Sequence, residues 1–90
     1  MPTVIFPSTL RKFIGQQLEV AVEGTSLKAI LQQITKTYPK VKTYILDSNE
    51  NVCAFVSIYL NETDVRFLNQ EATQVASCDI ITIVPAIAGG

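Results

Sequence analysis

The chain has 90 residues and a mass of 9.9 kDa, which is the size of one small domain. Hydrophobic residues make up 48% of the sequence and charged residues 17%, so the composition predicts a packed core and excludes a disordered chain. Seven basic and eight acidic residues give a net charge of −1, which argues against nucleic-acid binding through a strong basic field. The absence of histidine excludes histidine-based triads and histidine metal ligands.

The cysteines and the apolar stretches predict the compartment of the protein. Cys53 and Cys78 form no CxxC motif and are too few for a zinc site, so we expect reduced thiols in the cytoplasm. The N-terminal residues show no signal-peptide pattern, and the longest apolar stretch, Ile83 to Ala88, is too short for a membrane span. We therefore expect a cytoplasmic protein without a membrane partner.

Two β-rich runs near the N-terminus predict a hairpin. The first run consists of Thr3 to Phe6 and, after a proline, Leu10 to Ile14. Gly15 marks a turn. Between Leu18 and Val22 every second residue is apolar, which predicts a strand with one buried face. The runs on either side of Gly15 therefore predict a pair of antiparallel strands.

The strongest helical pattern follows. The side chain of Thr25 or Ser26 can accept a hydrogen bond from a free backbone N–H in the first turn of a helix. Pro39 predicts the end of this helix, because the residue before a proline is pushed out of the helical region. The apolar residues between these signals recur at the spacing of one helix face. They are Leu27, Ile30, Leu31, Ile34 and Tyr38.

The second half of the chain predicts a short helical turn, a polar loop, three strands and a connection. In chain order these are Tyr44–Leu46, Asp47–Asn51, Phe55–Leu60, Val65–Phe67 after a turn at residues 61–64, the connection Leu68–Ala76, and Ile80–Val84, which Pro85 ends. The order predicts an α+β domain with one main helix across one mixed sheet of four to five strands. We expect one domain at residues 1–85 and a flexible tail at residues 86–90.

Few residues of the domain suggest chemistry. Cys53 opens an apolar run, as a core cysteine would, and a structural role is also the favoured interpretation of Cys78. Glu62 and Asp64 lie two residues apart in a turn, a pattern typical of solvated surface carboxylates. The sequence therefore predicts no catalytic residue and no metal ligand in this chain.

The last residues are unusual. After Pro85 the sequence Ala-Ile-Ala-Gly-Gly carries no charged side chain, whereas frayed chain ends are usually polar. A diglycine has no Cβ atoms, so it can adopt backbone angles that other residues avoid and can pass through a narrow channel. A frayed end is the alternative interpretation, but an apolar tail after a core strand favours a functional carboxylate at Gly90.

These features together resemble a known family. The order of strands and helix, the end Ile83–Gly90, and the segments Phe6–Arg11 and Phe55–Phe67 are similar to the ubiquitin-like sulfur carriers of the ThiS/MoaD class, most of all to their CysO-type branch. The resemblance covers nearly the whole chain and implies a β-grasp fold. One difference is Cys78-Asp79, where family members often have Gly-Asp, so we expect a turn at Cys78 that favours a positive φ.

The resemblance implies a function for the tail. An ATP-dependent adenylyltransferase similar to ubiquitin-activating enzymes is expected to activate the carboxylate of Gly90, and a sulfur donor then converts it to a thiocarboxylate. The residues expected to thread into partner active sites are Gly89, Ala88, Ile87 and Ala86. The chain itself is expected to bind no cofactor and no metal, because the ATP is used by the partner enzyme.

The destination of the sulfur remains open at this point. The CysO resemblance favours cysteine biosynthesis with a cysteine synthase as acceptor, ahead of the large subunit of molybdopterin synthase and of thiazole synthase. The alternative is a ubiquitin-like modifier that is joined through Gly90 to lysines of target proteins. A third possibility is an interaction domain with an inert tail.

A carrier also needs a surface for its partners. If one side of the sheet packs on the helix, alternation along the strands places a second set of apolar residues on the other side. The expected docking residues are Ile5, Phe55, Tyr59, Ile80 and Val84, with Arg66 near the tail. The alternatives are that loops cover this face or that one strand has a different register. We expect a monomer when the carrier is free.

Overall fold

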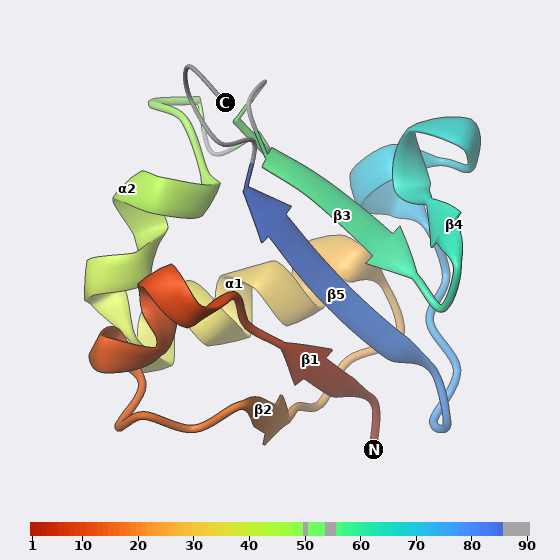
Figure 1. The fold of residues 1–90 in the computed structure, drawn as a ribbon. Helices are drawn as coiled ribbons and strands as arrows, with labels where there is room; N and C mark the ends of the chain where they lie inside the picture. Colours follow the sequence, from red (N-terminus) through yellow and green to blue (C-terminus); the bar gives the residue numbers. More distant parts are fainter. Residues whose placement is uncertain (50, 54–55, 86–90) are drawn as a thin grey trace.

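The computed structural model describes residues 1–49, 51–53 and 56–85. Figure 1 shows a sheet with α1 (Leu27–Thr37) across one face and the short α2 (Lys42–Ile45) at one end. The strands are β1 (Thr3–Ile5), β2 (Glu19–Ala21), β3 (Val56–Leu60), β4 (Thr63–Asp64) and β5 (Ile80–Pro85). Their order in the sheet is β2-β1-β5-β3-β4, and only β1 and β5 are parallel. The predicted mixed sheet with one main helix is confirmed.

The helix α1 forms where the capping and periodicity signals predicted it. The Oγ of Ser26 accepts a hydrogen bond from the N–H of Ala29 at 3.2 Å, and the helix ends just before Tyr38 and Pro39. Gly24 lies at a φ of 146°, and a Cβ there would meet the Ile30 side chain at 2.9 Å, so this position requires glycine. The buried stripe of the helix consists of Leu27, Ile30, Leu31 and Ile34, with Tyr38 half-buried beside it.

The core lies between α1 and the inner face of the sheet. The strand residues on this face alternate with outward-facing ones and are at most 4% exposed. They are Val4, Phe6, Val56, Ile58, Ile81 and Ile83. The alternation of these residues in the sequence was therefore sufficient to predict which side of the sheet packs on the helix. No helix among the described residues is both long and apolar enough to cross a membrane.

The N-terminal hairpin is confirmed as a strand pair, but its connection differs from the prediction. β1 pairs with β2, whereas the run predicted to continue the strand forms the 3₁₀-helix η1 (Ser8–Phe13), which buries Leu10. A short apolar run has no clear period, so strand and helix cannot be separated by pattern alone. Leu18 lies before the short strand β2 and is 53% exposed, contrary to the predicted buried face, while Val22 is buried.

The predicted return strand at Val65–Phe67 is wrong. The chain reverses over the two residues Asn61 and Glu62, so β4 begins at Thr63, and residues 65–67 form the 3₁₀-helix η3. Asn61 takes a φ of 57°, a conformation that asparagine tolerates and that tight hairpins need. The tighter turn moves the pairing two residues earlier in the chain. A further 3₁₀-helix, η4 (Gln70–Ala72), lies in the predicted connection.

Removal of a core side chain from α1 should measure the packing of the helix on the sheet. Ile34 is 1% exposed, so we expect Ile34→Ala to lower the free energy of unfolding by about 2–5 kcal/mol through the cavity it leaves. Gln32→Ala, at an exposed position of the same helix, is the matched control and should change stability little. Denaturant unfolding monitored by circular dichroism measures both, and equal effects of the two substitutions would contradict the packing.

Candidate functional site

The tail follows β5, the central strand of the sheet. β5 pairs with β1 through Ile80–Thr82 and with β3 through Ile81–Pro85, from Leu60 opposite Ile81 to Val56 opposite Pro85. Because β1 ends earlier, the last three residues of β5 are paired with β3 alone among the described strands. The end of β5 is therefore held by pairing with β3 up to Pro85, the residue before the predicted tail.

The predicted tail residues lie outside the described part of the chain, and so does one docking residue. These are Ala86, Ile87, Ala88, Gly89 and Gly90 of the tail and Phe55 before β3. The site can therefore be described up to Pro85, the last described residue, and through the side chains that surround the end of β5.

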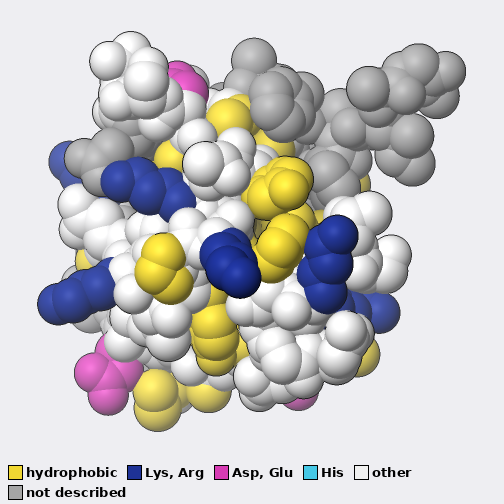
Figure 2. All heavy atoms as spheres, turned by 90° about the vertical axis from the view of Figure 1, so that its left-hand side faces the viewer, with side chains coloured by type: hydrophobic (Ala, Val, Ile, Leu, Met, Phe, Trp, Pro, Cys, Tyr) yellow, Lys and Arg dark blue, Asp and Glu magenta, His cyan; other side chains and the backbone are white. Residues whose placement is uncertain are grey.

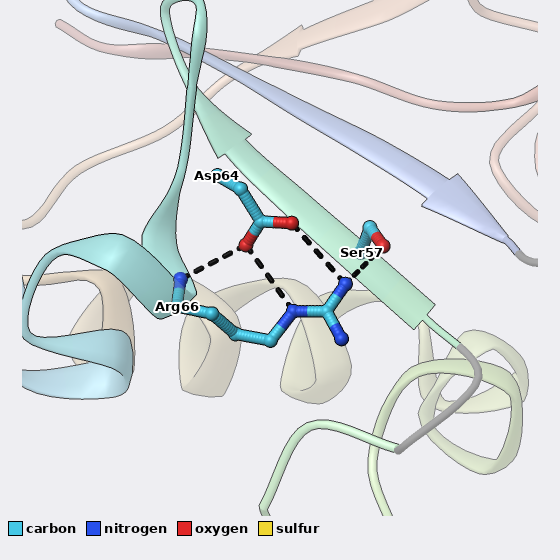
Figure 3. Close-up of polar contacts among 3 residues, drawn as sticks. All are labelled: Ser57, Asp64 and Arg66. Atoms are coloured by element: carbon cyan, nitrogen blue, oxygen red, sulfur yellow. Dashed lines mark hydrogen bonds and ion pairs between the residues drawn. The ribbon is translucent and has the colours of Figure 1, made fainter.

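Arg66 is fixed against β3, the strand that pairs with the end of β5 (Figure 3). Its Nη2 donates a hydrogen bond to the Oγ of Ser57 at 2.6 Å, and Ser57 is the cross-strand partner of Val84. The guanidinium also contacts Asp64, through Nε at 3.3 Å and Nη2 at 3.2 Å. The side chain of Arg66 is 57% exposed, so the cation is oriented but accessible near the point where the tail begins.

Asp64 orients Arg66 through its side chain and its backbone. The backbone N–H of Arg66 donates to Oδ1 of Asp64 at 2.9 Å, which caps η3, and the guanidinium adds the two contacts given above. The backbone hydrogen bond, followed by the side-chain hydrogen bond and the charge of Arg66, lowers the pKa of Asp64 below its ordinary value. The same carboxylate raises the pKa of Arg66. The pair therefore stays ionised at neutral pH.

The described docking residues of the strands lie on one face of the sheet, the side away from α1. Ile5 and Tyr59 both pair with Thr82 and are half-buried, whereas Val84 is 41% exposed beside Ser57. Ile80, at the start of β5, is 44% exposed. Hydroxyl side chains thus alternate with apolar ones, and the face is amphipathic where the sequence suggested a uniformly apolar surface.

The two cysteines are free thiols in different surroundings. Cys53 is buried, and its burial, together with the nearby charge of Asp47, raises the pKa of the thiol. Cys78 is exposed. The described part of the chain contains no group of three or more cysteine and carboxylate side chains that could hold a metal ion.

The turn before β5 does not need the positive φ that we expected at Cys78. The described non-glycine residues with positive φ are Gln16, Asn61 and Gln70. The turn is closed by a backbone hydrogen bond from the Asp79 N–H to the Ala76 carbonyl at 3.1 Å, and the Asp79 carboxylate accepts the Ala76 N–H in return. Ordinary turn geometry therefore accommodates Cys78 in place of glycine.

The sequence predicted a role for Arg66 but not for the two residues that anchor it. Asp64 was interpreted as a solvated turn carboxylate, and Ser57 as an ordinary strand residue. The spacing Asp64-x-Arg66 was a usable signal, because an aspartate can accept the N–H two residues later. The contact with Ser57 depends on the pairing of β3 with β4, which no local pattern revealed.

Comparison with known proteins agrees with this arrangement. Residues 4–90 match the ThiS family. The sulfur carrier protein CysO of Mycobacterium tuberculosis is 37% identical over 90 residues, which cover 98% of this chain and 97% of that protein. A chain in the crystal structure of the Amycolatopsis orientalis BexX/CysO complex is 30% identical, with a TM-score of 0.91 and full coverage of both chains. The small archaeal modifier protein 1 of Methanosarcina acetivorans is 25% identical, with a TM-score of 0.87 and coverage of 99% of this chain and 95% of that one.

The fold is therefore that of the small ubiquitin-like β-grasp proteins, as the sequence predicted. The chain belongs to the ThiS family. It is a sulfur carrier of the CysO/ThiS type, which is a substrate of partner enzymes and not a catalyst.

The ionisation of Asp64 should depend in part on Arg66. We expect Arg66→Ala to raise the pKa of Asp64 only part of the way toward its ordinary value of 3.8, because the backbone N–H of residue 66 remains as the larger cause of the shift. The pKa of Asp79 is lowered by the Ala76 N–H and then by the Asn61 amide, so it should not change. Carboxyl chemical shifts followed by NMR during a pH titration measure both groups.

The same shift fixes the sign of the pH dependence of stability. The folded pKa of Asp64 is below the unfolded one, so the contribution of Asp64 to the free energy of unfolding is complete above the unfolded pKa and is lost as the pH falls through the folded pKa.

A full return of the Asp64 pKa to 3.8 in Arg66→Ala would contradict the dominance of the backbone hydrogen bond. No change at all would contradict the contact with the guanidinium.

Proposed function

We propose that the carboxylate of Gly90 is adenylated by an ATP-dependent enzyme similar to ubiquitin-activating enzymes and is then converted to a thiocarboxylate. The observation that carries this proposal is membership of the ThiS family over residues 4–90, a range that includes the diglycine. The structure adds a fixed starting point for the tail, because β5 is paired up to Pro85.

The proposed chemistry explains why the tail is simple. A carboxylate oxygen of Gly90 displaces pyrophosphate from ATP, which turns a poor electrophile into an acyl-adenylate with AMP as leaving group. A sulfur donor then attacks the carbonyl carbon and releases AMP. The product is a nucleophile that stays deprotonated at neutral pH. Partner enzymes supply the ATP site and the general bases, and the carrier supplies a slender end without charged side chains.

The proposed destination of the sulfur is cysteine biosynthesis. The 37% identity to a CysO sulfur carrier over the whole chain supports a cysteine synthase as the acceptor. On this route the thiocarboxylate attacks an aminoacrylate held on a pyridoxal-phosphate enzyme. The large subunit of molybdopterin synthase and thiazole synthase are the other acceptors to test.

Protein modification is the second candidate function. The likeness to the small archaeal modifier protein 1 of Methanosarcina acetivorans supports it, because that protein is 25% identical and has nearly the same fold. The same activated Gly90 would then form an isopeptide bond with a target lysine. Lysine-linked adducts recovered from cell extract would distinguish this function from sulfur transfer.

The mass of the carrier is the first test. After incubation with ATP, sulfide and the purified adenylyltransferase of the same organism, we expect a fraction of the protein to be heavier by the mass difference between sulfur and oxygen, with the change in the C-terminal peptide. Deletion of Gly90 should abolish this fraction and leave the melting temperature unchanged, because the tail is expected to bury almost no surface. The unmodified carrier measured alone also establishes whether Gly90 bears a free carboxylate.

Two results would contradict these expectations. A tail that stays a plain carboxylate under these conditions would contradict the carrier proposal. A lower melting temperature after deletion of Gly90 would contradict a tail that is free of the domain.

The outer face of the sheet is the proposed docking surface for these enzymes. We expect Ile80→Asp to raise the KM for the carrier in activation by about tenfold, which corresponds to about 1.4 kcal/mol, because an acidic group would be buried without a partner. Leu18→Asp is the matched control, since Leu18 is also exposed, at 53% against 44% for Ile80, but lies directly before β2 at the edge of the sheet. Equal KM values for the two variants would contradict docking through this face.

A further inference from the structure

One side of the molecule gathers cations from three elements. Arg11 and Lys12 lie on η1, Lys36 lies in the last turn of α1, and Lys40 lies on η2 (Pro39–Val41). Figure 2 shows Lys and Arg side chains over this side of the protein, with hydrophobic side chains between them. We call these four residues the cationic surface.

An aromatic pair joins η1, one element of the cationic surface, to α2. The rings of Phe13 and Tyr44 stack with their centroids 5.3 Å apart and an angle of 27° between their planes, which joins η1 to α2. The Nζ of Lys12 lies 5.2 Å from the centroid of Phe13. Tyr44 is 49% exposed, so a partner that meets the cations also meets an aromatic ring.

The charge of this surface is not balanced within the described structure. Lys12, Lys36 and Lys40 form no ion pair with any described residue. Residues 1–42 carry a net charge of +4 and residues 43–90 a net charge of −5, so a chain of net charge −1 is strongly polarised. Lys36 lies in the last turn of α1, where a cation interacts favourably with the helix dipole.

The helix α2, which the Phe13–Tyr44 pair joins to the cationic surface, lies next to the end of β5. The N–H of Cys53 donates to the carbonyl of Ile45 at 2.8 Å, and the N–H of Val56 donates to the carbonyl of Cys53. Val56 in turn pairs with Pro85. These contacts connect α2 to the end of β5, and Figure 1 shows α2 at the end of the sheet to which β5 points. An enzyme that receives the tail therefore comes close to α2 and its basic neighbours.

We propose that the activating enzyme contacts the cationic surface through an acidic patch, in addition to any contact with the outer face of the sheet. The inference rests on the proposed function and names the adenylyltransferase because both candidate functions pass through it. Apolar and aromatic side chains between the cations are typical of protein interfaces. The net negative charge of residues 43–90 would repel a polyanion such as RNA.

Charge reversal at matched lysines tests the proposal. Lys12→Glu and Lys40→Glu change the cationic surface, whereas Lys28→Glu makes the same change of charge at an exposed position at the other end of α1. The activity measured is ATP–pyrophosphate exchange by the purified adenylyltransferase, as a function of carrier concentration, at low and at physiological salt. Melting temperatures close to that of the unmodified protein establish that all three variants are folded.

We expect Lys12→Glu and Lys40→Glu to raise the KM for the carrier by about tenfold at low salt, with kcat unchanged, because complementary charge acts mainly on encounter and docking. The KM of the unmodified carrier should rise with salt, and that of the two variants should rise less. Lys28→Glu should behave like the unmodified carrier.

Three results would overturn the proposal. Equal KM values for Lys40→Glu and Lys28→Glu would show that the position of the charge does not matter. Binding of a labelled single-stranded RNA at physiological salt that is lost in Lys40→Glu, with the KM unaffected, would assign the surface to a nucleic acid. An unmodified carrier that is not activated at all would contradict the proposed function and this inference with it. This failure can be distinguished from a failure of the inference alone, because it is seen with the unmodified protein.

Discussion

The insertion of β5 between β1 and β3 is the constraint on which the rest of the structure depends. The strand is parallel to one neighbour and antiparallel to the other, and it contributes Ile81 and Ile83, which are 0% and 2% exposed. A strand with two buried side chains and ladder pairing on both sides is held far more firmly than an edge strand. A terminal segment that follows such a strand begins from a fixed position and direction.

Polar contacts hold the start of β5 and fix a cation on the strand that pairs with its end. At its start, Asn61 donates its N–H to the Ile80 carbonyl at 2.7 Å, and its side chain accepts the Ile80 N–H and donates to Asp79. At its end, Ser57 lies opposite Val84 and carries the hydrogen bond from Arg66. The β3–β4 hairpin supplies Asn61, and the residues that follow it supply Arg66. The same hairpin therefore positions the central strand at one end and an accessible cation at the other.

The sequence predicted the elements whose signals are local and missed those that depend on distant pairing. α1 has a capping serine, a continuous apolar stripe and a terminating proline, all within residues 26–39, so its position follows from the sequence. The strand at Thr63–Asp64 depends on the left-handed conformation of Asn61, which is in turn stabilised by hydrogen bonds to Ile80, nineteen residues away. Burial of Leu10 against the core likewise favours a 3₁₀-helix over the strand that its apolar neighbours suggested.

The position of Cys53 fits the chemistry proposed for the tail. An activated carbonyl at Gly90 would react with a thiolate of the carrier itself if one were available near the end of β5. Cys53 precedes β3 by three residues, on the side of the sheet where β5 ends, but its side chain is buried and its pKa is raised. A covered, protonated thiol is a poor nucleophile. If Gly90 is activated as proposed, the packing that buries Cys53 would also keep this thiol from competing for the activated carbonyl.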